Sequence, residues 1–97
     1  MSDMIVLITQ TFRIDTYGNE VADEAESMVY AEVESIAQSE FYAAANTQLN
    51  PEYRFTVFFA DYGGQQIVKY NGKRYSVYRT FRTGDRLEIY TERKIGA

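Results

Sequence analysis

The chain contains no cysteine and no histidine among its 97 residues. Without cysteine it can form neither a disulfide framework nor a thiolate metal site. Without histidine it lacks the commonest general base of enzymes and the commonest metal ligand. The longest apolar run near the start, residues 4–8, is too short for a signal peptide or a membrane span. We therefore expect a protein that is made in a reducing cytoplasm and does not enter a membrane.

The sequence also lacks the usual patterns of catalysis. It has no phosphate-binding glycine loop and no nucleophile with a partner base. The carboxylates of residues 22–26 could perform acid–base work or bind a hard cation, but no glycine follows at metal-loop spacing. A solvated acidic face explains them better. We expect no catalytic residue, no cofactor and no metal, and hence no enzyme.

The charge is distributed unevenly along the chain, whose formal net charge is -4. Residues 1–50 carry nine acidic side chains and one basic one, whereas residues 51–97 carry five acidic and nine basic. In one compact domain this asymmetry predicts two surfaces of opposite sign. Such surfaces can serve recognition or can simply be solvated, and the sequence leaves both interpretations open.

Hydrophobic periodicity predicts a protein made mainly of strands. Residues 4–14 are rich in β-branched side chains, and residues 28–36 alternate with the period of two that is typical of strands. Residues 21–27 are acidic and are predicted to form a loop. The remaining predicted strands are 53–60, 66–70, 73–81 and 87–94. We expect one domain, residues 1–97, in which a small antiparallel sheet is rolled into a barrel.

One short helix is predicted between the second and third strands. Ser39 is a suitable N-cap, and Glu40 follows it where the helix dipole favours negative charge. The apolar side chains then recur at helical spacing. Asn50-Pro51 ends the segment, because a residue before proline is pushed out of the α region.

The pair Asn71-Gly72 predicts a tight hairpin with a type I′ turn. A two-residue loop pairs Val68 with Tyr75 and Tyr70 with Lys73. One face of the hairpin should then face the core, and the other should face solvent. The predicted core face holds Val68, Tyr70, Tyr75, Val77 and Phe81, and the predicted wet face holds Lys69, Arg74, Ser76, Tyr78 and Arg82. Binding of single-stranded nucleic acid needs a run of exposed aromatic rings in a basic groove, and this face offers only Tyr78.

The order of the segments resembles a known family. "VYAEVESI" is followed by "SEFYAAA", "YRFTVFF", "VKYNGKRYSV" and "RLEIYTER". This order, from about Phe12 to Lys94, is similar to that of the phage head-closure proteins, also called head–tail joining or stopper proteins. The apolar first strand departs from the family, whose members often carry a more charged, arginine-containing segment there.

The resemblance implies a structural protein of the virion. Members form a ring beneath the portal and adaptor of a tailed phage, close the DNA channel after packaging, and offer a docking surface to the tail. The chain would then lie in the head–tail connector, and in the host cytoplasm during assembly. Its partners would be the portal, adaptor and tail proteins and further copies of itself, with the packaged DNA met indirectly and no membrane; the isolated chain could be monomeric. The family's plug corresponds to residues 37–51, around Phe41, Tyr42, Asn46, Gln48 and Leu49.

The charge asymmetry suggests how such a ring could be held together. A ring contact is heterologous, since one patch meets a different patch on the next copy. The candidate residues are Lys69, Arg74 and Arg82 on one side, and Glu20, Asp23, Glu24 and Glu26 on the other. The alternative is a small nucleic-acid-binding barrel of the OB type, whose affinity for DNA would fall steeply with salt.

Overall fold

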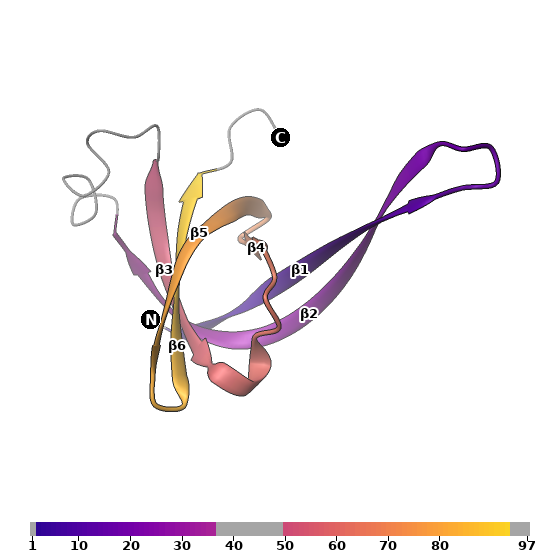
Figure 1. Cartoon of the computed structure of the whole chain (residues 1–97). Coiled ribbons are helices and arrows are strands. Elements are labelled where there is room, and N and C mark those ends of the chain that lie inside the picture. The colour runs from indigo at the N-terminus through magenta and orange to yellow at the C-terminus, as the bar shows by residue number, and fades with distance from the viewer. Residues whose placement is uncertain (1, 37–49, 94–97) are drawn as a thin grey trace.

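A computed structural model describes residues 2–36 and 50–93, which form six antiparallel strands in one sheet (Figure 1). The strands are β1 (Ser2–Ile14), β2 (Glu20–Ser35), β3 (Pro51–Phe58), β4 (Ile67–Tyr70), β5 (Lys73–Thr83) and β6 (Arg86–Arg93). They follow the order β1-β2-β3-β6-β5-β4, and the sheet closes on itself because β4 also pairs with β1. The predicted antiparallel, mainly β architecture is therefore confirmed.

The predicted inserted helix falls on residues 37–49, which lie outside the described residues. The same holds for the plug residues Phe41, Tyr42, Asn46, Gln48 and Leu49. Within the described ranges there is no α-helix, and the helical geometry is limited to a single 3₁₀ turn, η1 (Phe59–Asp61). This turn carries the chain from β3 toward β4.

Alternate side chains of the strands point into the closed sheet and form its core. The fully buried members include Ile5, Leu7, Phe55 and Ile89. Four aromatic rings, from Tyr53, Phe55, Tyr70 and Tyr75, pack at one place with centroid separations of 5.4–6.4 Å. Edge-to-face aromatic pairs stabilise a core beyond the area they bury, so this cluster ties β3 to β4 and β5.

The β4–β5 hairpin has the predicted register. Val68 lies opposite Tyr75 and Tyr70 lies opposite Lys73. Asn71 and Gly72 both have positive φ, at 52° and 75°, as a type I′ turn requires. Tyr70 and Tyr75 are buried as predicted, because this register turns both rings toward the core.

The face predicted for the far end of β5 is wrong. Val77 lies opposite Thr91, but the next pair is Arg79 with Tyr90, so Tyr78 is an extra residue in the strand. Such a bulge moves every later side chain to the opposite face. Phe81 therefore lies opposite the outward-facing Glu88 and is 56% exposed, although the sequence pattern assigned it to the core.

The acidic segment 21–27 is also corrected, because it is strand and not loop. It belongs to β2, which pairs with β1 without interruption from Ser2 opposite Glu32 to Ile14 opposite Glu20. The turn between the strands is tightened by Asp15, whose Oδ1 accepts hydrogen bonds from the backbone N–H groups of Tyr17 and Asn19. This segment is a strand because its backbone pairs with β1. Neither of its faces is buried, so its apolar and polar residues need not alternate.

The β1–β2 hairpin extends well beyond the closed part of the sheet (Figure 1). β1 pairs with β4 only over Val6–Ile8, and β2 pairs with β3 only over Glu32–Ser35. Residues 9–25 therefore form a two-stranded ribbon with no third strand on either side, which we call the arm. The rest of the described chain is called the body. A two-stranded hairpin is marginally stable in water by itself.

Candidate functional site

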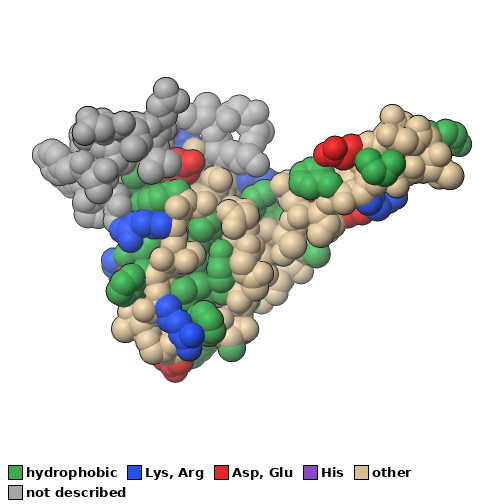
Figure 2. All heavy atoms as spheres, viewed as in Figure 1, with side chains coloured by type: hydrophobic (Ala, Val, Ile, Leu, Met, Phe, Trp, Pro, Cys, Tyr) green, Lys and Arg blue, Asp and Glu red, His purple; other side chains and the backbone are tan. Residues whose placement is uncertain are grey.

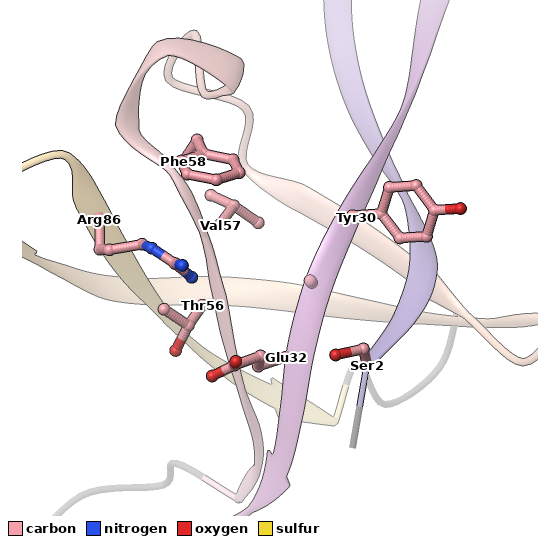
Figure 3. A pocket seen from close by; sticks show the side chains of 8 residues that line it. Ser2, Tyr30, Glu32, Thr56, Val57, Phe58 and Arg86 are labelled. Atoms are coloured by element: carbon pink, nitrogen blue, oxygen red, sulfur yellow. The ribbon is translucent and has the colours of Figure 1, made fainter.

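A pocket lies where β2 and β3 separate, beside the N-terminal end of β1 (Figure 3). Its volume is about 220 Å³. Tyr30 and Glu32 border it on the β2 side, and Val57 and Phe58 border it on the β3 side. Ser2, Ala31, Thr56 and Arg86 complete its lining. Tyr30 is 70% exposed, so this shallow pocket has an apolar rim that the rest of the described residues leave uncovered.

The body carries two exposed phenylalanines, each covered by an arginine; Phe58 and Arg86 line the pocket, whereas Phe59 and Arg82 do not. The Arg82 guanidinium carbon lies 3.6 Å from the centroid of the Phe59 ring, and that of Arg86 lies 4.7 Å from the Phe58 ring. Stacking of this kind is favourable because the ring faces are electron-rich. We call these four residues the arginine corner. Neither guanidinium takes part in an ion pair with another residue of the described ranges.

The end of the arm is both apolar and acidic. Phe12 lies opposite Ala22 and Ile14 lies opposite Glu20, so all four side chains share one face of the ribbon. Phe12 is 63% exposed, Ile14 is 68% exposed, and Tyr17 in the turn is 89% exposed. We call Phe12, Ile14, Tyr17, Glu20 and Ala22 the arm-tip patch. In the space-filling view, hydrophobic side chains gather along the arm and also at the lower end of the body beside arginines and lysines (Figure 2).

Charged side chains hold the base of the arm to the body. Arg74 on β5 donates two hydrogen bonds to the Glu24 carboxylate, of 2.7 and 2.9 Å, and Gln10 donates a third of 2.9 Å. This contact raises the pKa of Arg74. Farther along the arm, Arg13 pairs with Asp23 at 2.7 Å. Three of the predicted interface charges, Arg74, Glu24 and Asp23, are thus paired within one chain.

The other predicted interface residues are spread over the molecule. Lys69 lies opposite Arg74 on the β4–β5 hairpin and is half-buried. Arg82 lies at the other end of β5, past the bulge, and belongs to the arginine corner. Glu20 belongs to the arm-tip patch, and Glu26 lies on β2 at the base of the arm. The three predicted basic residues therefore do not form one continuous surface.

A polar network on the outer face of β2, β3 and β6 has no signature in the sequence. Arg54 forms ion pairs with Glu34 and, at 3.7 Å, with Glu88, which also accepts a 2.6 Å hydrogen bond from the Tyr90 hydroxyl. Hydrogen bonding with Tyr90 is the largest of the effects that raise the pKa of Arg54. The Arg79 guanidinium covers the Tyr90 ring at 3.6 Å. Because these charges pair with one another, we assign the network to stability, although the buried Arg54 Nε has no hydrogen-bond partner among the described residues.

The described residues contain no cluster of three or more acidic side chains positioned to hold a metal ion. None of their helical segments has the length and apolar character that a membrane-spanning helix needs. A comparison with protein-family models and a comparison with curated proteins each found no match. The candidate functional surfaces are therefore defined by geometry alone: the arm-tip patch, the β2–β3 pocket and the arginine corner.

Proposed function

We propose that this chain is a head-closure, or stopper, protein of a tailed phage. In this function it is a non-enzymatic part of the virion that forms a ring under the portal and adaptor, closes the DNA channel and docks the tail. The resemblance in segment order suggests this function, and one structural observation supports it most. The family's plug corresponds to residues 37–51, and the two strands that flank this segment, β2 and β3, are neighbours in a closed sheet.

The attachment of this segment is tight on both sides. Ser35 at the end of β2 pairs with Tyr53 in β3, and the Ile36 N–H donates a 3.1 Å hydrogen bond to the Glu52 carbonyl. The Asn50 carbonyl in turn accepts a 3.0 Å hydrogen bond from the Arg93 N–H of β6. Neighbouring strands lie about 4.8 Å apart, so the segment leaves and re-enters the sheet at one place. A plug needs such a frame, because the force on it must be carried by the ring and not by the segment itself.

The arm also favours an assembly function over an enzymatic one. It exposes large apolar side chains on a ribbon that is only marginally stable alone, and such surfaces in soluble proteins usually mark an interaction site. By contrast, three open pockets on the described residues hold no pair of groups arranged as nucleophile and base. A protein whose exposed arm is covered in a ring fits this combination.

The arginine corner is the one feature that favours a nucleic-acid-binding barrel. Exposed rings beside arginines could stack with bases. However, Arg82 and Arg86 already lie over the rings of Phe59 and Phe58. Tyr78, the aromatic side chain expected on the basic face, packs against Tyr90 at 6.4 Å. With a net charge of -4, the chain fits the stopper function better.

Electron microscopy of the chain mixed with its candidate adaptor–portal complex tests the proposal. We expect an additional ring below the adaptor, and little affinity of the free chain for single-stranded DNA at any salt concentration. Replacing residues 37–49 with a Gly/Ser linker of equal length should leave the ring in place but lower the retention of packaged DNA. Tight DNA binding that weakens steeply with salt, together with no ring, would show that the nucleic-acid function is the correct one.

A further inference from the structure

We propose that the arm of one copy docks on the body of the next copy, with its arm-tip patch covering the β2–β3 pocket and the Phe58–Arg86 pair that lines it. The occupant of the pocket is thus a second copy of this chain. This inference rests on the proposed function, because it specifies the contact that would repeat around the ring. It assigns the apolar contact to Phe12 and Ile14, and the polar contact to Glu20 and Arg86.

The other described residues leave the end of the arm largely exposed. Phe12 and Ile14 point from the same face of a ribbon that has no third strand, and Tyr17 extends the exposed surface into the turn. The arm also leads away from η1 and the β5–β6 turn, so it does not fold back onto its own arginine corner (Figure 1). Covering these side chains would remove apolar surface from water, which is favourable at about 25 cal/mol per Å².

The receiving surface has matching chemistry. Tyr30 and Phe58 border the pocket from two separating strands, and both side chains are exposed. Arg86 lies over the Phe58 ring, where the stacking holds its guanidinium beside the apolar rim (Figure 3). An apolar side chain from the arm can therefore fill the pocket while a carboxylate next to it meets a cation.

The charges of the two surfaces are complementary. The arm contains four acidic residues and one arginine. Of the acidic residues, Asp23 and Glu24 are engaged by Arg13 and Arg74, whereas Glu20 lies directly opposite Ile14 in the arm-tip patch. On the receiving side, Arg82 and Arg86 form no ion pair with another described residue. Glu20 and Arg86 are thus the pair that fits a contact between copies, and opposite charges would steer the encounter as well as fix its register.

A contact between two different patches has a geometric consequence. Because the arm-tip patch and the pocket lie on different parts of the molecule, each copy can give one arm and receive another. Repetition of such a heterologous contact forms a closed ring when the rotation between copies closes. A symmetric dimer would instead bring identical patches together.

Engineered disulfides give the most direct test, because the chain has no cysteine of its own. Copies with Ile14→Cys and differently tagged copies with Tyr30→Cys are mixed, assembled on the adaptor–portal complex and oxidised. We expect a cross-linked pair that contains both tags. The matched control replaces Tyr30→Cys with Lys73→Cys, an exposed position on the β4–β5 turn, and should give no cross-link. Equal cross-linking to both positions, or none to Tyr30→Cys, would overturn the inference.

Charge reversal tests the polar half of the contact. Glu20→Arg and Arg86→Glu should each weaken assembly about 1.5- to 5-fold per contact, as expected for loss of one exposed ion pair. The two substitutions made in the same chain should restore much of the assembly. Denaturation midpoints equal to that of the wild type would show that the body of each variant remains folded. If assembly of the double variant is weakened by the sum of the two single effects, with no recovery, Glu20 and Arg86 do not form a direct pair.

The two proposals fail in distinguishable ways. If a ring forms on the adaptor–portal complex without the specific cross-link, the stopper function is supported and the proposed arm contact is rejected. If no ring forms, the stopper function fails, and oxidation of the concentrated, isolated chain then decides the arm contact alone. In that experiment on the isolated chain, a specific cross-link between Ile14→Cys and Tyr30→Cys supports the contact between copies, and the absence of this cross-link rejects the contact.

Discussion

The two ends of β1 have similar amino acids and opposite surroundings. Near its start, Ile5 and Leu7 are completely buried, whereas farther along Phe12 is 63% exposed and Ile14 is 68% exposed. Both ends pair with β2 in one continuous register. Two conditions differ: Ile5 and Leu7 point into the closed sheet while Phe12 and Ile14 lie on the other face of β1. In addition, β4 lies beside the first part, while no third strand lies beside the second. Apolar residues in a strand therefore indicate burial only where they face the interior and a neighbouring strand closes the sheet around them.

The body and the arm consequently depend on different interactions. The body is stabilised by its aromatic cluster and by side chains that fill the interior of a closed sheet. The arm is stabilised by backbone pairing, by the Asp15 turn and by ion pairs that remain accessible to water. We expect substitutions in the body to change global stability, and substitutions in the arm to change assembly.

The same substitution placed in both regions should show the largest difference. Phe55→Ala removes a fully buried ring and should lower the free energy of unfolding by about 3–5 kcal/mol. Phe12→Ala removes a mostly exposed ring and should change it by less than about 0.5 kcal/mol. Urea denaturation of the two variants measures both values. Comparable losses would mean that the arm folds as part of the core.

A second pair of variants compares the two hairpin turns. Gly72 and Gly18 have φ of 75° and 81°, a region that β-branched residues resist. Gly72→Val should cost about 1–3 kcal/mol of global stability, because this turn sets the register of a core hairpin. Gly18→Val should leave global unfolding nearly unchanged and should accelerate amide exchange within residues 9–25. A large loss of global stability in Gly18→Val would contradict the independence of the arm.

The ion pair at the base of the arm should have a smaller effect. Arg74→Ala and Glu24→Ala both remove an exposed contact, so the loss of stability should be smaller than that caused by Gly72→Val. A double-mutant cycle, read by amide exchange in the arm, should show that the second substitution adds little to the first. Simple additivity of the two effects would indicate that the pair does not hold the arm.

The smallest effect is expected from a tyrosine, and only in alkaline solution. Burial raises the pKa of Tyr75 above its usual value of 10, and Tyr53 and Glu52 add to this effect. The folded state therefore holds the Tyr75 proton more tightly, and this contribution is complete below about pH 10 and is lost as the pH rises further. Tyr75→Phe should reduce the fall in melting temperature between pH 9 and pH 11. Tyr17→Phe, at an exposed site in the arm, is the matched control and should not change that fall.

Local sequence signals predicted the elements that depend on local interactions. Asn71-Gly72 predicted both the turn and the pairing of Val68 with Tyr75, because a two-residue loop leaves only one register. The alternation of residues 28–36 likewise predicted the part of β2 that carries Val29, Ala31 and Val33 into the core. In each case the signal and its cause lie within a few residues of one another.

Features that depend on distant strands could not be predicted in this way. The bulge at Tyr78 has no signature in the alternation of β5, so the exposure of Phe81 was missed. The acidic part of β2 lacks the alternation of a strand, because a ribbon without a core face needs none, so its sequence predicts a loop. The pairing of Arg74 with Glu24 joins residues that are 50 positions apart, which a division of the chain by charge cannot reveal.

The seam between β1 and β4 gives the molecule a mechanical weak point. Only three residue pairs, from Val6 with Lys69 to Ile8 with Ile67, join these strands, and the arm continues directly from β1. A tensile load on the arm therefore reaches this short ladder before it reaches the aromatic cluster, with the Arg74–Glu24 contact acting as an outer tether. We expect single-molecule pulling between residues 17 and 93 to show an early rupture at this seam. In an assembly, a subunit whose arm is pulled by its neighbour should open first at the same seam.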